Sequence, residues 1–145
     1  MMAYSGKFSL KNTNKYLGDP TNIWYRSLWE RRVMVRLDDD PNVIEWSNEE
    51  IIIPYLSPID GRWHRYFPDF FVRVRNRNGV QEAMILEVKP LKQSIPPPIK
   101  KRITRQYIQE VATFGINEAK WKAADEYCKT RGWTFKVITE KDLGI

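Results

Sequence analysis

The chain has little of the chemistry on which disulfide-stabilised and zinc-binding proteins depend. Its 145 residues include one cysteine, Cys128, and one histidine, His64. A single cysteine excludes an internal disulfide and any zinc site built from clustered cysteines, and one histidine cannot build a multi-histidine metal site. No apolar run approaches the roughly 20 residues that a membrane-spanning helix needs. We therefore expect a soluble intracellular protein without a membrane partner.

Positive charge exceeds negative charge, and the two signs are unevenly placed. There are 24 Lys and Arg against 18 Asp and Glu, a net charge of +6. Such an excess favours an anionic partner such as nucleic acid, although it does not determine the fold. Seven acidic residues and no basic one lie within 38–60, whereas 88–109 holds no acidic residue. This separation indicates one face for an anion and another face for a different partner.

Hydrophobic periodicity predicts a single domain that mixes helices and strands. Helical spacing of apolar residues predicts helices over 21–37, with Thr21 as N-cap, and over 100–114 and 117–131. β-rich runs predict strands over 50–56, 63–75, 81–89 and 133–139. We therefore expect an α/β fold, a central mixed β-sheet flanked by helices, over residues 21–145. Residues 1–20 are polar and predict an N-terminal arm that orders against a partner rather than a packed element.

One predicted hairpin brings two carboxylates together. Its turn is the stretch from Asn76 to Gly79, a strong hairpin pattern, and Asp69 and Glu87 each lie nine residues from Asn78. A tight turn there places the two carboxylates at opposite or nearly opposite positions, where like charges destabilise a sheet. Lys89 lies two residues beyond Glu87 and therefore on the same face of its strand.

Two interpretations of these three residues remain open from spacing alone. They form either a partly exposed face of ion pairs on an edge strand, or a site where a divalent cation relieves the repulsion between the carboxylates. Mg²⁺ prefers oxygen ligands and commonly uses one or two carboxylates together with phosphate oxygens. Glu30 has the same two interpretations, since it falls beside the apolar stripe of its helix and either pairs with Arg26 or points into a site.

Three segments resemble the E…PD…ExK pattern of the restriction-endonuclease-like nucleases. They are Tyr25–Glu30, Tyr66–Phe70 and Leu86–Pro90. The wider pattern, with Lys120-Trp121 and the Arg131-Gly132-Trp133 step, resembles the TnsA-type branch of that superfamily. Together with the start Met2–Lys7, the whole chain is similar to a family of tailed-phage nucleases that act at head completion.

The resemblance implies hydrolysis of phosphodiester bonds in double-stranded DNA with Mg²⁺, for which Mn²⁺ substitutes. It implies that Asp69 and Glu87 hold the metal. Lys89 would orient the attacking water or stabilise the developing charge, and Glu30 would assist the metal or Lys89. By the same resemblance the protein acts in the host cytoplasm on packaged DNA before the tail joins, is retained in the head–neck region, and contacts portal, neck or head proteins through the arm and the acidic 38–60 segment.

Basic residues near this pattern form a second candidate set. Contact with the DNA backbone is one interpretation, and solvated surface charge is the other, for Arg62, Arg65, Arg73, Arg75, Lys100, Lys101, Arg102 and Arg105. Two alternatives to the phage nuclease remain: a structural head–neck connector that keeps a nuclease-like fold, and a transposon-end endonuclease subunit. A plasmid-nicking assay with and without Mg²⁺ separates enzyme from connector.

Overall fold

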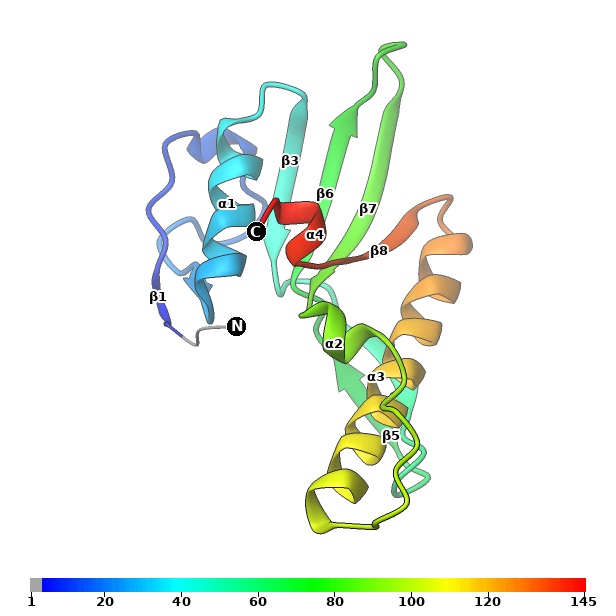
Figure 1. Cartoon of the computed structure of the whole chain (residues 1–145). Coiled ribbons are helices and arrows are strands. Elements are labelled where there is room, and N and C mark those ends of the chain that lie inside the picture. Colours follow the sequence, from blue (N-terminus) through cyan, green and yellow to red (C-terminus); the bar gives the residue numbers. More distant parts are fainter. Residues whose placement is uncertain (1–3) are drawn as a thin grey trace.

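A four-stranded mixed sheet forms the centre of the protein in the computed structural model, which describes residues 4–145 (Figure 1). Its order is β3-β6-β7-β8, with bounds Val43–Asn48, Phe70–Arg75, Gln81–Val88 and Thr134–Ile138. The pairs β3–β6 and β6–β7 are antiparallel, and β7–β8 is parallel. The predicted α/β fold with a mixed sheet and flanking helices is confirmed.

In the part of the chain that the structure describes, two small sheets and four α-helices surround this centre. The short antiparallel pairs are β1 with β2 and β4 with β5, with bounds Gly6–Lys7, Trp24–Tyr25, Ile53–Leu56 and Trp63–Tyr66. The helices are α1, α2, α3 and α4, with bounds Leu28–Asp39, Leu91–Ser94, Arg105–Lys129 and Glu140–Leu143, and the 3₁₀ turn η1 spans Thr13–Lys15. Within residues 4–145, no helix has both the length and the apolarity that crossing a bilayer demands.

Strand alternation gives the central sheet two apolar faces, and each face packs against residues of a different helix. On one face Phe70, Val72 and Leu86 join Met34 of α1 in one buried cluster. On the other face Ile85 packs in a second cluster, with Ala124 and other residues of α3. Glu87, two residues beyond Ile85, therefore lies on the side of the sheet that faces α3.

The predicted hairpin between β6 and β7 forms with the predicted register. Asn76 closes the turn, because its side-chain oxygen accepts hydrogen bonds from the backbone N–H groups of Asn78 and Val80 at 2.9 and 3.0 Å. Gly79 adopts φ +77°, a left-handed conformation that favours glycine. Phe70 pairs with Leu86 at the far end of the ladder. The next positions in that register are Asp69 and Glu87.

Two predictions give wrong element bounds and one strand is missed, each for an identifiable reason. The run 63–75 is two strands, because the buried Pro68 lies between β5 and β6 and cannot donate to a ladder. The predicted helices over 100–114 and 117–131 are one helix, α3, in which Gly115 is tolerated as an interior glycine. Strand β3 over Val43–Asn48 was not predicted, since its acidic and polar residues mask the alternation.

The first long helix begins at Leu28 instead of near Thr21. The Ser27 side chain accepts a hydrogen bond from the backbone N–H of Glu30, so Ser27 is the N-cap. Residues 24–25, inside the predicted helix, form β2 and pair with β1. The apolar residue Ile23 fits the helical period, but it is buried in the core from an extended segment instead.

The prediction that residues 1–20 form an unpacked arm is wrong for residues 4–20; residues 1–3, with Met2 and Ala3 of the resemblance, lie outside the described residues. Phe8 and Tyr16 are only 7% and 8% exposed and pack edge-on against the buried Trp46. Asp38, at the end of α1, fastens this segment to the helix. Its carboxylate accepts the backbone N–H groups of Lys11 and Asn12 at 2.8 and 3.0 Å.

We expect Asp38→Ala to lower the free energy of unfolding by about 2–4 kcal/mol, because it leaves two backbone N–H groups without their carboxylate acceptor. Urea denaturation measures this change, and amide exchange at Lys11 and Asn12 should accelerate. Asp39→Ala is the matched control, since Asp39 is exposed, and it should stay within about 0.5 kcal/mol of the wild type. Equal stability of the two variants would contradict the fastening role of Asp38.

Candidate active site

A cleft of about 650 Å³ opens at the end of the central sheet where β6 begins and β7 ends. The N-terminus of α1 lies at this same end, and the β4–β5 pair and the first turns of α3 extend beyond it (Figure 1). Segments far apart in sequence thus meet at one place. The cleft is lined by Arg26, Glu30, Glu49, Arg65, Tyr66, Phe67, Asp69, Glu87, Val88, Lys89 and Lys120.

Asp69 and Glu87 form the centre of this cleft. Asp69 follows the buried Pro68 and is held at both its backbone and its side chain. Its carbonyl oxygen accepts the backbone N–H of Glu49 at 3.1 Å, and its carboxylate accepts the backbone N–H of Val88 at 2.7 Å. The Asp69 side chain therefore lies against the chain segment that carries Glu87, as the hairpin register requires.

The two carboxyl groups are difficult to ionise together. Burial raises the pKa of Asp69 well above its ordinary value, and the nearby Glu87 carboxylate raises it further. Burial also raises the pKa of Glu87, which is 7% exposed, although Lys89 and Lys120 partly offset the effect. Within the described residues, Glu87 Oε2 is buried and has no hydrogen-bond partner.

This donor set fits a divalent cation. Two carboxylates in one cleft, one with a buried oxygen that lacks a partner, provide hard oxygen ligands and a net negative charge that a cation would offset. No group of three or more His, Cys, Asp and Glu side chains in residues 4–145 is placed to hold an ion. The two carboxylates match the one or two that Mg²⁺ commonly takes from a protein.

Glu30 lies in the cleft and does not pair with Arg26. Arg26 forms its ion pair with Glu49 at 3.2 Å. The Glu30 carboxylate instead accepts the Ser27 hydroxyl at 3.2 Å and is 5% exposed. Burial, and then the Asp69 carboxylate, raise the pKa of Glu30 to about 7. Of the two interpretations from sequence, the surface pair with Arg26 is wrong, and Glu30 lines the cleft beside Asp69.

Lys89 and Lys120 supply positive charge from two different elements. Lys89 follows β7, and its backbone N–H donates to Ile138 of β8 at 2.9 Å, which extends the parallel ladder. Lys120 of α3 was not among the predicted site residues. Its spacing carried a signal, because Lys120 lies three residues after Asn117 and four before Ala124, both buried on the inner face of α3. A lysine at a core-facing position indicates a functional role.

Of the eight basic residues predicted to contact DNA, one lines the cleft. Arg65 lies on β5, with its guanidinium 5.7 Å from the centre of the Phe67 ring. Arg73 is paired with Glu45 at 2.9 Å and lies four residues along β6 from Asp69. The others are exposed and lie outside the cleft: Arg62 before β5, Arg75 at the far end of β6, and Lys100, Lys101, Arg102 and Arg105 at and before the start of α3.

The acidic segment 38–60 is largely engaged within the chain. Asp38 is buried, and Glu45 and Glu49 are in the two ion pairs named above. Asp60 lies 2.7 Å from the ring of His64. The Asp40 carboxylate accepts the backbone N–H of Asn42 at 2.8 Å. Five of the seven acidic side chains therefore have partners in the fold, which leaves less negative charge for contact with another protein than the sequence suggested.

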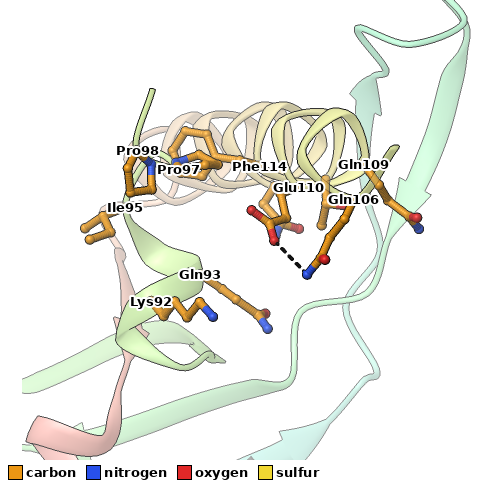
Figure 2. Close-up of a pocket in the computed structure, with 11 residues that line it drawn as sticks. Lys92, Gln93, Ile95, Pro97, Pro98, Gln106, Gln109, Glu110 and Phe114 are labelled. Atoms are coloured by element: carbon orange, nitrogen blue, oxygen red, sulfur yellow. Dashed lines mark hydrogen bonds between the residues drawn. The ribbon is translucent and has the colours of Figure 1, made fainter. Parts of the chain in front are cut away.

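A second pocket, of about 370 Å³, lies between the α2 segment and α3 (Figure 2). Apolar side chains such as Ile95, Pro97 and Phe114 line it, and its one acidic side chain within the described residues, Glu110, accepts a hydrogen bond from Gln106 at 3.3 Å. It shares no lining residue with the cleft at Asp69. Its lining among the described residues includes no carboxylate pair, so this pocket lacks the donor set that the cleft at Asp69 provides.

The raised pKa of Glu30 predicts a specific dependence of stability on pH in metal-free protein. Since the pKa is near 7 in the fold and near 4.5 when unfolded, Glu30 stabilises the fold fully below about pH 4.5, and this contribution is lost as pH rises through 7. In Glu30→Gln the side chain at this position is neutral at every pH. Relative to Glu30→Gln, the wild type should lose about 3 kcal/mol of unfolding free energy between pH 4.5 and 8.

Urea denaturation of both proteins in EDTA across this range measures the difference. Parallel stability curves for the wild type and Glu30→Gln would contradict the raised pKa of Glu30.

Two comparisons with known proteins agree with this geometry. The family model described as TnsA-like endonuclease N terminal matches residues 40–140, which include Asp69, Glu87, Lys89 and Lys120. The chain is also 37% identical over 146 residues to the head completion nuclease of Enterobacteria phage T4, covering 98% of this chain and 95% of that protein. Both matches confirm the resemblances found in the sequence. The chain therefore belongs to the family of TnsA-like endonuclease N-terminal domains.

Proposed function

We propose that this protein is a divalent-metal-dependent deoxyribonuclease that acts in phage head completion, cutting or trimming packaged DNA before heads and tails join. The observation that carries the proposal is the cleft in which two buried carboxylates face an ammonium group. The similarity to a phage head completion nuclease over nearly the whole chain supports the biological setting.

Asp69 and Glu87 would hold the metal, with Mg²⁺ the expected ion and Mn²⁺ a substitute. When bound, such an ion polarises the phosphoryl oxygen and lowers the pKa of water. Lys89 places a positive charge beside the phosphate, where negative charge develops as the bond to the incoming oxygen forms. Glu30 exchanges a proton near neutral pH, and its ionised form adds negative charge next to Asp69.

DNA would reach the cleft past Arg65 and Arg26, which line its mouth. We propose that Arg62, Lys100, Lys101, Arg102 and Arg105 add contacts to the phosphate backbone beyond the cleft, and that Arg73 and Arg75 contribute along β6. Each phosphate neutralised by such a residue steepens the dependence of log affinity on log salt by about 0.9.

Portal, neck or head proteins are the proposed protein partners, with retention in the head–neck region after assembly in the host cytoplasm. A connector without enzymatic activity is disfavoured, because docking gives no reason to keep Glu30, Asp69 and Glu87 in one cleft at the cost of their desolvation. A transposon-end endonuclease is the second candidate, favoured by the family model. Co-purification with phage heads separates these two settings.

Two substitutions test the catalytic assignment. Asp69→Asn keeps an acceptor for the Val88 N–H but removes the negative charge, and Lys89→Ala removes the ammonium. Each should lower Mg²⁺-dependent nicking of supercoiled plasmid by at least about 10²-fold while the fold, measured by circular dichroism and melting temperature, stays intact. Glu126→Gln and Lys92→Ala, at exposed positions outside the cleft, are the controls. Full activity in both test variants would refute the assignment.

Metal binding should stabilise the protein in a pH-dependent way. Because binding requires ionised carboxylates and the pKa values of Asp69 and Glu87 are raised, Mg²⁺ or Mn²⁺ should raise the melting temperature more at pH 8 than at pH 5.5. The shift should disappear in Asp69→Asn and Glu87→Gln. A shift of equal size in these variants would place the ion elsewhere.

A further inference from the structure

We propose that Lys120 of α3 and Lys89 after β7 form a phosphate-binding site in the cleft that holds the carboxylate pair, and that Lys120 contacts the phosphodiester that is cut. The inference rests on the proposed function, because it names the part of the cleft that receives the DNA backbone.

Lys120 is placed in the cleft by its packing. Its ammonium lies 5.7 Å from the centre of the Tyr55 ring and 5.6 Å from the centre of the Tyr66 ring. Both tyrosines are buried in the cluster beneath α3. Cation–π contacts with two fixed rings restrict a side chain that is otherwise flexible. The Lys120 ammonium is therefore held in position before any ligand arrives.

Neither ammonium has an anionic partner of its own. Among residues 4–145, no acidic side chain lies within ion-pair distance of Lys89 or Lys120, and neither Nζ atom donates a hydrogen bond. The two lysines are near enough for the charge of Lys89, together with burial, to lower the pKa of Lys120. Two positive charges in one cleft repel each other, and a bound anion would relieve this repulsion.

The Glu87 carboxylate does not relieve the repulsion between the two lysines. Its influence on the pKa of Lys120 is smaller than those of burial and Lys89. If a divalent cation binds to the carboxylates, it neutralises their negative charge. The two ammonium groups in the cleft then still lack an anionic partner. A phosphodiester carries one negative charge and several acceptor oxygens, so it can be contacted by both lysines at once.

The alternative role for Lys120 is structural neutralisation of Glu87. Structural neutralisation predicts that loss of the Lys120 charge changes the stability of the fold and its metal affinity. The phosphate site predicts that the same loss weakens DNA binding in the absence of metal. The two roles can therefore be separated without relying on cleavage alone.

The test compares Lys120→Met, Lys120→Arg and Lys122→Met. Methionine keeps the stem that packs on the tyrosines and removes the charge, and arginine restores a positive charge. Lys122 is exposed and lies two residues along α3, about 200° around the helix, so Lys122→Met is the matched control. Single-turnover cleavage of a duplex oligonucleotide is measured with Mg²⁺, and binding of the same duplex is measured in EDTA at several salt concentrations.

We expect Lys120→Met to cleave about 10²-fold more slowly at saturating protein, with an unchanged melting temperature. Its binding in EDTA should weaken, and the salt slope should fall by about 0.9. Lys120→Arg should recover part of both losses, and Lys122→Met should match the wild type in cleavage rate.

Two results would overturn the phosphate site. One is duplex binding in EDTA that is the same for Lys120→Met and Lys122→Met. The other is a loss of activity in Lys120→Met that comes with a lowered melting temperature and is not recovered by Lys120→Arg. If the wild type cleaves no DNA at all, the proposed function fails, whereas the binding measurement in EDTA still decides the phosphate site.

Discussion

The repulsion between Asp69 and Glu87 is the constraint on which the rest of the site depends. Burial raises the pKa of both carboxyl groups, and the Glu87 carboxylate raises that of Asp69 further, so a proton or a cation is needed to offset the charge that they share. The protein holds both carboxylates in place even so. Val88 donates its backbone N–H to Asp69, and the buried Pro68 fixes the chain just before it. Stability is thus lowered at the point where the proposed metal ion would bind.

The negatively and positively charged groups of the cleft come from different elements of the fold. The carboxylates come from the hairpin and from the start of α1, while the ammonium groups come from the end of β7 and from the middle of α3. A cation and a phosphodiester are ligands of opposite charge that ordinarily bind together in nucleases. A cleft with both kinds of groups on separate elements can hold the two ligands side by side without pairing its own charges first. That separation explains why neither Lys89 nor Lys120 forms an ion pair within residues 4–145.

The sequence was sufficient for the features that local rules determine. The turn at Asn76–Gly79 defines the hairpin register, and the register places Asp69 beside Glu87 without knowledge of the rest of the fold. Long-range features were not predictable in this way. The packing of residues 4–20 depends on the buried Asp38, whose partners lie 26 and 27 residues earlier in the chain. Lys120 reaches the cleft only because α3 crosses the sheet there, although its place on the buried stripe of α3 was visible in the sequence.

The position of Glu30 shows why the true start of α1 matters for function. Apolar periodicity fits a helix that begins at Thr21 as well as one that begins at Leu28, because the spacing of apolar residues does not mark where a helix begins. The start of the helix is set by the N-cap Ser27, whose hydroxyl accepts a hydrogen bond from the Glu30 N–H and donates one to the Glu30 carboxylate. With the longer helix, Glu30 would lie in the third turn. With the observed start it lies in the first turn, where α1 meets the open end of the hairpin, and the same capping contacts that begin the helix bring its carboxylate into the cleft.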